Sequence, residues 1–159
     1  MNKELILREA REQDLDFLAK LWLELMVHHE NDSTLFQVNH QEPSGIKEIL
    51  LKKLENENTQ IFLAENKIGI LGFIVCFYQI GSEIFKLYKK GYIAETVISK
   101  PFRGQGIGRE LYRKAENWLL EKKVDHIQLQ VSVKNQSGIQ FWTQQGFDKV
   151  TFVMNKEIK

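Results

Sequence analysis

The sequence predicts an α/β (α+β) fold with a central mixed, mostly antiparallel sheet of six to seven strands and helices on both faces. Three observations support this prediction. Segments with helical apolar spacing are interspersed with segments in which apolar and polar residues alternate. Residues 59–80 have the pattern of an antiparallel hairpin. A strand, a glycine-rich turn, a helix and a strand follow over residues 91–133, which indicates a parallel, right-handed crossover.

The first elements are a short strand and two helices. "ELILRE" is expected to be extended, and residues 14–30 are expected to form a helix with Asp14 as its N-cap. Its apolar residues lie at helical spacing: Leu15, Leu18, Leu21, Trp22, Leu25 and Met26. Residues 31–41 are expected to be a loop. A second amphipathic helix is expected over residues 43–57, which begin with Pro and Ser.

A hairpin and a further strand come next. Residues 59–80 predict a strand, a turn at 65–67 and a long, almost wholly apolar strand. Residues 81–90 predict a polar connection, and residues 91–99 predict the strand that leads into the glycines.

The second half of the chain continues as helix, strand, helix and strand. We expect a helix over residues 106–123 and a strand over residues 125–133. A short helix is expected within residues 135–147, ended by Gly146. The last strand is expected over residues 149–158.

Composition limits the function classes. The chain has 159 residues, so we expect residues 1–159 to form one domain. A net charge of +1 provides no overall field for nucleic acid or an anionic membrane, so neither is expected as a partner. No apolar run approaches the roughly 18 residues that span a bilayer, and we expect a cytoplasmic protein. Cys76 is the single cysteine and can form no intrachain disulfide.

The stretch "RGQGIG" at residues 103–108 leaves a strand and enters a helix. Free backbone N–H groups at a helix N-terminus bind anions, and glycines let a phosphate approach the backbone closely. The residues after the last glycine are Arg109 and Glu110, which excludes a P-loop. The spacing also fails the G-x-G-x-x-G dinucleotide fingerprint. The pattern that fits is [RQ]-x-x-G-x-[GA], which alone also suits a turn that merely packs a strand against a helix.

Residues 91–147 resemble the GNAT-type N-acetyltransferases. The central family motif follows a strand and opens a helix, and is present as Arg103, Gly106 and Gly108. The next motif combines a strand ending near Asn with a helix carrying F-[YW]-x-x-x-G-F, and is present as Asn135, Phe141, Trp142, Gly146 and Phe147. The elements before these motifs agree with the family order.

The resemblance implies acetyl-CoA as cosubstrate, with no metal, in a cleft where the fourth and fifth strands splay apart. It implies that the pyrophosphate is bound by Arg103, Gly104, Gln105, Gly106, Ile107, Gly108 and Arg109. It implies that the pantetheine arm pairs with the backbone of Val97, Ile98 and Ser99. Asn135 and Trp142 are expected near the cofactor.

The resemblance also implies an acid–base pair. Family members often use a carboxylate in the fourth strand as the base, and Glu95 occupies that place, although it could also point to solvent or pair with a lysine. The usual tyrosine acid is replaced by Trp142, whose indole is no acid at neutral pH. Protonation of the departing thiolate is left to water or to Tyr88, Tyr92 or Tyr112, or the thiolate leaves unassisted.

Our first interpretation is an acetyl-CoA-dependent N-acetyltransferase in which a primary amine attacks directly in a ternary complex. The acceptor is a small-molecule amine or a protein or peptide amine, and a homodimer is possible. The alternatives are a CoA-binding module or sensor without transfer chemistry, and another nucleotide-binding enzyme with a glycine turn. His28 and Asp32 lie at i, i+4 but lack a third metal ligand at a suitable spacing, so no metal site is expected.

Overall fold

A computed structural model describes residues 4–29 and 44–158 of the chain. The loop predicted at 31–41 lies outside the described residues. The helices and strands follow one another in this order: β1 (Ile6–Glu9), α1 (Leu15–His29), α2 (Ser44–Glu55), β2 (Thr59–Asn66), β3 (Gly69–Ile80), β4 (Lys89–Ile98), α3 (Ile107–Glu121), β5 (His126–Leu129) and α4 (Gln136–Gln144). This order agrees with the predicted order from the first strand to the last helix.

The strands form one mixed sheet with the order β1-β2-β3-β4-β5. Neighbouring strands are antiparallel except for β4 and β5, which are parallel because α3 returns the chain across the sheet. The predicted mixed sheet with a parallel crossover is therefore confirmed. The described residues form five strands, fewer than the six to seven predicted.

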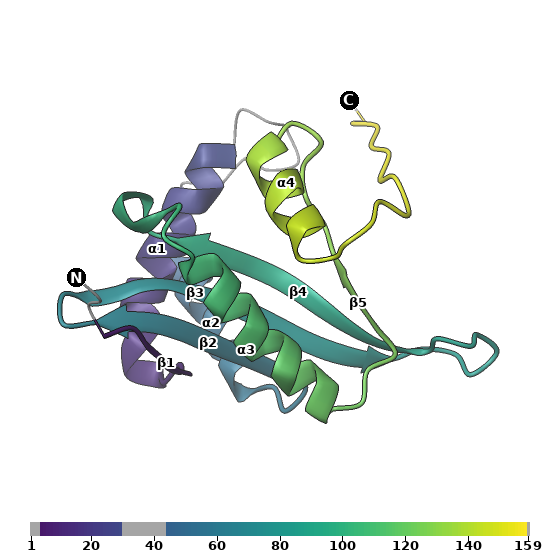
Figure 1. Ribbon diagram of the computed structural model, residues 1–159, viewed down its shortest axis with the longest axis horizontal. Coiled ribbons are helices and arrows are strands. Elements are labelled where there is room, and N and C mark those ends of the chain that lie inside the picture. Colours follow the sequence, from purple (N-terminus) through teal and green to yellow (C-terminus); the bar gives the residue numbers. More distant parts are fainter. Residues whose placement is uncertain (1–3, 30–43, 159) are drawn as a thin grey trace.

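Helices cover both faces of the sheet, as predicted (Figure 1). The core on one face joins α1 and α2 to the sheet through residues such as Leu18, Leu50 and Phe73. The core on the other face joins α3 to the sheet through residues such as Leu111, Leu119 and Ile74. The alternation of β3 explains both cores, because Phe73 faces α1 and α2 whereas Ile74 faces α3.

Strand β4 is irregular at its centre and loses a neighbour there. Cys76 is opposite Ile93 and Val75 is opposite Glu95, so Ala94 is an extra residue in a β-bulge. Strand β5 pairs with β4 only as far as Ile93, which lies opposite Leu129. Beyond that point β4 is hydrogen-bonded to β3 alone, and the two parallel strands separate. The splay expected between the fourth and fifth strands is present.

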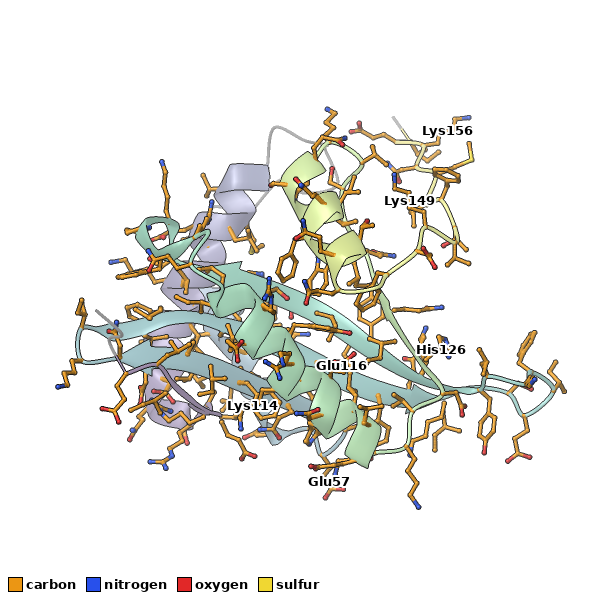
Figure 2. The ribbon with its side chains drawn as sticks, in the orientation of Figure 1. Glu57, Lys114, Glu116, His126, Lys149 and Lys156 are labelled. Carbon is orange, nitrogen blue, oxygen red and sulfur yellow. The ribbon has the colours of Figure 1, made fainter. Side chains whose placement is uncertain are left out.

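The C-terminal strand predicted at 149–158 is absent from the structure of the described residues. That segment is extended beyond α4 without pairing, and its apolar side chains are exposed: 86% for Val150, 85% for Phe152 and 94% for Met154. Lys149 and Lys156 lie on it (Figure 2). The strand predicted at 125–133 is likewise shorter, since β5 ends at Leu129. A strand needs a neighbour, and β5 offers an edge of only four residues.

None of the helices in the described part of the chain has the length and apolar character that crossing a membrane requires.

Candidate active site

The glycine-rich turn between β4 and α3 depends on backbone conformations that other residues rarely adopt. Gly104 has φ +75° and Gly106, the N-cap of α3, has φ +82°. A short 3-10 turn over Lys100–Phe102, with proline at its centre, precedes them and ends regular pairing of the strand. The chain can therefore reverse sharply and expose the first turn of α3.

Most backbone amides of this turn have no hydrogen-bond partner in the described part of the chain, although the Arg103 amide donates to the Lys100 carbonyl at 3.4 Å. In the described residues, the amides from Gly104 to Arg109 donate no hydrogen bond, and the first helical bond of α3 runs from the Glu110 amide to the Gly106 carbonyl at 3.2 Å. The Gln105 side chain closes the turn by donating to the Pro101 carbonyl at 3.1 Å. The amides and the positive end of the helix dipole form a cradle suited to a diphosphate.

Residues of the turn differ in what they offer an anion. Arg103, Gln105 and Arg109 have exposed side chains, whereas the side chain of Ile107 is 5% exposed and belongs to the core. Ile107 therefore offers its amide alone. A Cβ on Gly108 would lie 3.4 Å from the ring of Phe141, so α3 approaches α4 closely here. The two sequence motifs meet at this contact.

The open edge of β4 begins where β5 departs. The Ser99 amide donates to the Leu71 carbonyl at 2.8 Å and so points to β3. Because backbone groups alternate along a strand, the backbone groups of Ile98 point to the open edge, where its carbonyl accepts from Arg103 Nε at 3.0 Å. The side chain of Val97 is buried in the core beside α1 and α2. An amide-containing arm could add to this edge as a strand.

Thr96 was not singled out from the sequence, but the structure places it at the same edge. Its Oγ1 is buried without a hydrogen-bond partner among the described residues. A buried hydroxyl without a partner costs free energy unless a ligand satisfies it. The sequence carried no signal for this residue, because a threonine in a strand is ordinary.

Glu95 lies on the face of the sheet that carries α1 and α2. Its side chain is 16% exposed, and its Oε2 lies 3.6 Å from Lys53 Nζ on α2, at the separation of an ion pair rather than a hydrogen bond. Burial raises the pKa of the Glu95 carboxyl, and the charge of Lys53 acts in the opposite direction. A carboxylate whose pKa is raised toward neutrality is suited to act as a base.

Asn135 and Trp142 hold the α4 region together. The Asn135 side chain caps α4 by accepting from the Gly138 amide at 2.9 Å. Trp142 packs edge-on against Tyr112, Phe141 and Phe147, with centroids 5.5, 4.8 and 5.5 Å away. These contacts account for both residues without a ligand, and their nearness to the cofactor stays a prediction.

The three tyrosines considered as proton donors lie in different places. Tyr112 donates from its hydroxyl to Glu116 at 2.8 Å on α3, and burial raises its pKa. Tyr88 is 38% exposed in the connection before β4. Tyr92 stands on β4 and senses Glu95, because burial first and then the charge of Glu95 raise its pKa. Among these three tyrosines, Tyr92 is the one whose pKa responds to the charge of Glu95.

Lys53 is a second residue that sequence analysis did not single out. The sequence analysis allowed that Glu95 pairs with a lysine but named none, and only the packing of α2 on the sheet brings Lys53 to Glu95. No group of three metal-ligating side chains occurs in the described ranges. Asp32, which the sequence analysis considered with His28 as a possible metal ligand, lies outside those ranges.

Comparison with known proteins identifies a matching family and several relatives of this chain. The model of the Acetyltransferase (GNAT) family matches residues 8–147. N-alpha-acetyltransferase MAK3 of Arabidopsis thaliana is 34% identical over 86 residues, which are 54% of this chain and 43% of the plant protein. An uncharacterized N-acetyltransferase of Archaeoglobus fulgidus is 27% identical over 139 residues, covering 87% of this chain and 90% of that protein. The match thus spans less than half of the plant relative.

Solved structures share the fold. A predicted acetyltransferase from Clostridium acetobutylicum, solved with acetyl-CoA, superposes with a TM-score of 0.79 at 18% identity, covering 97% of this chain and 96% of that one. At this identity the likeness shows the fold alone.

Proposed function

The chain belongs to the acetyltransferase (GNAT) family, and we propose that it is an acetyltransferase that transfers acetyl from acetyl-CoA to a primary amine by direct attack in a ternary complex. The observation that carries this proposal is the row of unpaired amides from Gly104 to Arg109, next to the open edge of β4. A phosphate-bearing ligand with an amide arm would satisfy both.

The cofactor-binding residues follow from these two features. The amides from Gly104 to Arg109 would hold the pyrophosphate, and the exposed side chains of Arg103 and Arg109 at the two ends would add charge, whereas the Arg103 amide already donates to the Lys100 carbonyl at 3.4 Å. The edge of β4 from Val97 to Ser99 would hold the pantetheine arm, chiefly through the backbone of Ile98. Thr96 Oγ1 would gain the partner that it lacks. Bound in this way, acetyl-CoA supplies an activated thioester.

Glu95 is the proposed base. An amine attacks a thioester only when neutral, so Glu95 would take a proton from the acceptor ammonium, directly or through water. The departing thiolate also needs a proton. Tyr92 or solvent is the proposed source of that proton, because Trp142 has no acidic proton and the Tyr112 hydroxyl is hydrogen-bonded to Glu116.

The acceptor that we propose is an amine on a polypeptide or on a small molecule. The name of the plant relative favours an N-terminal α-amine of a polypeptide, so peptides with free N-termini are the first acceptors to test, followed by small amines. Release of free thiol from acetyl-CoA that depends on an amine would establish transfer. A CoA-binding module would bind acetyl-CoA and release no thiol on addition of any amine.

The cradle is tested by Gly106→Asp with Gly106→Asn as its matched control. Both side chains tolerate the left-handed conformation of Gly106 better than most, and they differ mainly in charge. We expect the aspartate to lower CoA affinity at least about 100-fold beyond the asparagine, since it places a like charge at the phosphate. Isothermal titration with CoA measures this. Equal affinities in the two variants would place the phosphates elsewhere.

A further inference from the structure

Lys53 differs from the other lysines of α2. Lys47 and Lys52 pair with Asp16 and Glu48 at the surface, and their side chains are 51% and 72% exposed. The side chain of Lys53 is 24% exposed and reaches down to Glu95 on β4. Burying an ammonium group is unfavourable unless it is paired, so this contact is the one that accounts for the position of Lys53.

Few other groups act on Glu95. From its own strand, Tyr92 senses its charge, and the Tyr92 ring stacks on Phe77 with centroids 5.1 Å apart. Lys90 Nζ lies over the Tyr92 ring, 5.8 Å from its centroid. Among the described residues, Lys53 is the sole group whose charge is found to act on the carboxyl of Glu95.

The geometry of the pair also differs from that of a structural ion pair in the same protein. Arg8 holds Asp14 through two hydrogen bonds of 2.8 and 2.9 Å that occupy both carboxylate oxygens. Lys53 stands 3.6 Å from Glu95, and Oε2 is left without a hydrogen bond. Lys53 therefore supplies positive charge to the carboxyl of Glu95 without a short hydrogen bond to it.

A buried base faces a conflict. Desolvation favours the neutral acid, but only the carboxylate can accept a proton from the substrate. We propose that Lys53 is a positioning residue that holds Glu95 in its ionised form and in place between turnovers. This inference rests on the proposed function of Glu95 as the base.

The test compares Lys53→Met and Lys53→Arg with Lys52→Met as the control on the same helix. Two quantities are measured for each protein. One is the pH at which the Glu95 carboxyl titrates, from the ¹³C NMR signal of its side chain, assigned by its loss in Glu95→Gln. The other is the acidic limb of kcat/KM for acetyl transfer. If Lys53→Met fails to fold, Lys53→Gln removes the same charge.

We expect Lys53→Met to raise the titration midpoint of Glu95 by at least about 1 pH unit, because an opposite charge at this range lowers a carboxyl pKa by about 1 to 3 units. Lys53→Arg should restore most of the wild-type value, and Lys52→Met should not move it. An unchanged midpoint in Lys53→Met would overturn the inference, whatever the activity.

The rate measurement separates this inference from the proposed function. If the midpoint of Glu95 and the acidic limb move together, both are supported. If the midpoint moves and the limb does not, Lys53 still controls the charge of Glu95, but Glu95 is not the base.

Discussion

At the scale of single residues, the surroundings of Asp14 and Glu95 act on their carboxyl groups in opposite directions. The hydrogen bond from Arg8 lowers the pKa of Asp14, and the Arg11 amide donates a further bond at 2.8 Å. Burial raises the pKa of Glu95, which has a more distant partner. The first arrangement ties a carboxylate into the fold, and the second agrees with the proposed role of Glu95 as the base.

Replacing Glu95 by glutamine should lower turnover by about 10² to 10⁴, the usual contribution of a general base. The loss should be greatest above the pH at which Glu95 ionises, and it should shrink in acid, where the wild-type carboxyl is itself protonated and cannot act as a base. The affinity for CoA should not change, because the cradle lies at α3. Steady-state kinetics across pH measure the effect, and a pH profile that matches the wild type would clear Glu95 of this role.

Asp14→Asn should lower the free energy of unfolding at neutral pH by about 1 to 3 kcal/mol, the range for hydrogen bonds to charged groups. Because the pKa of Asp14 is lowered from 3.8 in the folded protein, its contribution is complete above pH 3.8 and is lost as the pH falls through the folded value. The stability difference between variant and wild type should therefore shrink in acid. Urea unfolding at several pH values measures it.

Asp16→Asn is the matched control for this experiment. Asp16 pairs with Lys47, but its side chain is 82% exposed, so solvent screens the pair. We expect almost no change in stability. A comparable loss in both variants would mean that the network around Arg8 contributes no more to the free energy of unfolding than the exposed pair of Asp16 and Lys47.

At the scale of elements, β4 connects the two halves of the site. Its backbone edge faces the space that β5 leaves, and Glu95 projects from its bulge toward α1 and α2. The bulge at Ala94 turns the strand so that Glu95 and Val97 both face that layer while Ile93 faces α3. One strand thereby presents both the proposed cofactor edge and the candidate base.

Gly72 on β3 controls how closely β4 can approach. A Cβ at this position would lie 2.5 Å from the carbonyl oxygen of Val97 and 3.2 Å from the Cα of Ile98. Both are backbone atoms, so the strands would have to shift. We expect Gly72→Ala to destabilise the protein by about 1 to 3 kcal/mol and to weaken CoA binding through the displaced edge.

Gly45→Ala serves as the control, because a Cβ there meets nothing within 4 Å. Thermal unfolding and CoA titration of both variants test the prediction. If Gly72→Ala binds CoA like the wild type while losing stability, the edge of β4 is not where the cofactor binds.

At the scale of the whole molecule, the two cores share the sheet and should open together. Cys76 reports on this, because its thiol is fully buried and burial raises its pKa to about 12. We expect thiol reagents to modify Cys76 only through unfolding, at a rate far below that of a free thiol. CoA should slow the reaction further by stabilising the folded state. Rapid modification of the native protein would show a local opening of the sheet.

Much of the fold could be predicted because its signals are local. Helical spacing located α1, α2, α3 and α4 to within a few residues, and the hairpin of β2 and β3 was visible from alternation. The prediction of a strand at 149–158 was wrong, and the reason is physical. Alternation shows that a segment suits a sheet, but pairing requires an available edge, which local sequence does not describe.

The sequence by itself determined the family, the order of nearly all elements and the glycine-rich turn that opens α3. Each of these depends on neighbouring residues, such as the glycines whose backbone freedom the turn requires. Only the tertiary structure decided that Lys53 meets Glu95, that none of the described residues forms a hydrogen bond with Thr96 Oγ1 and that Trp142 packs among aromatic rings. These facts join residues far apart in the chain, and burial and distance between such residues arise only when the layers pack.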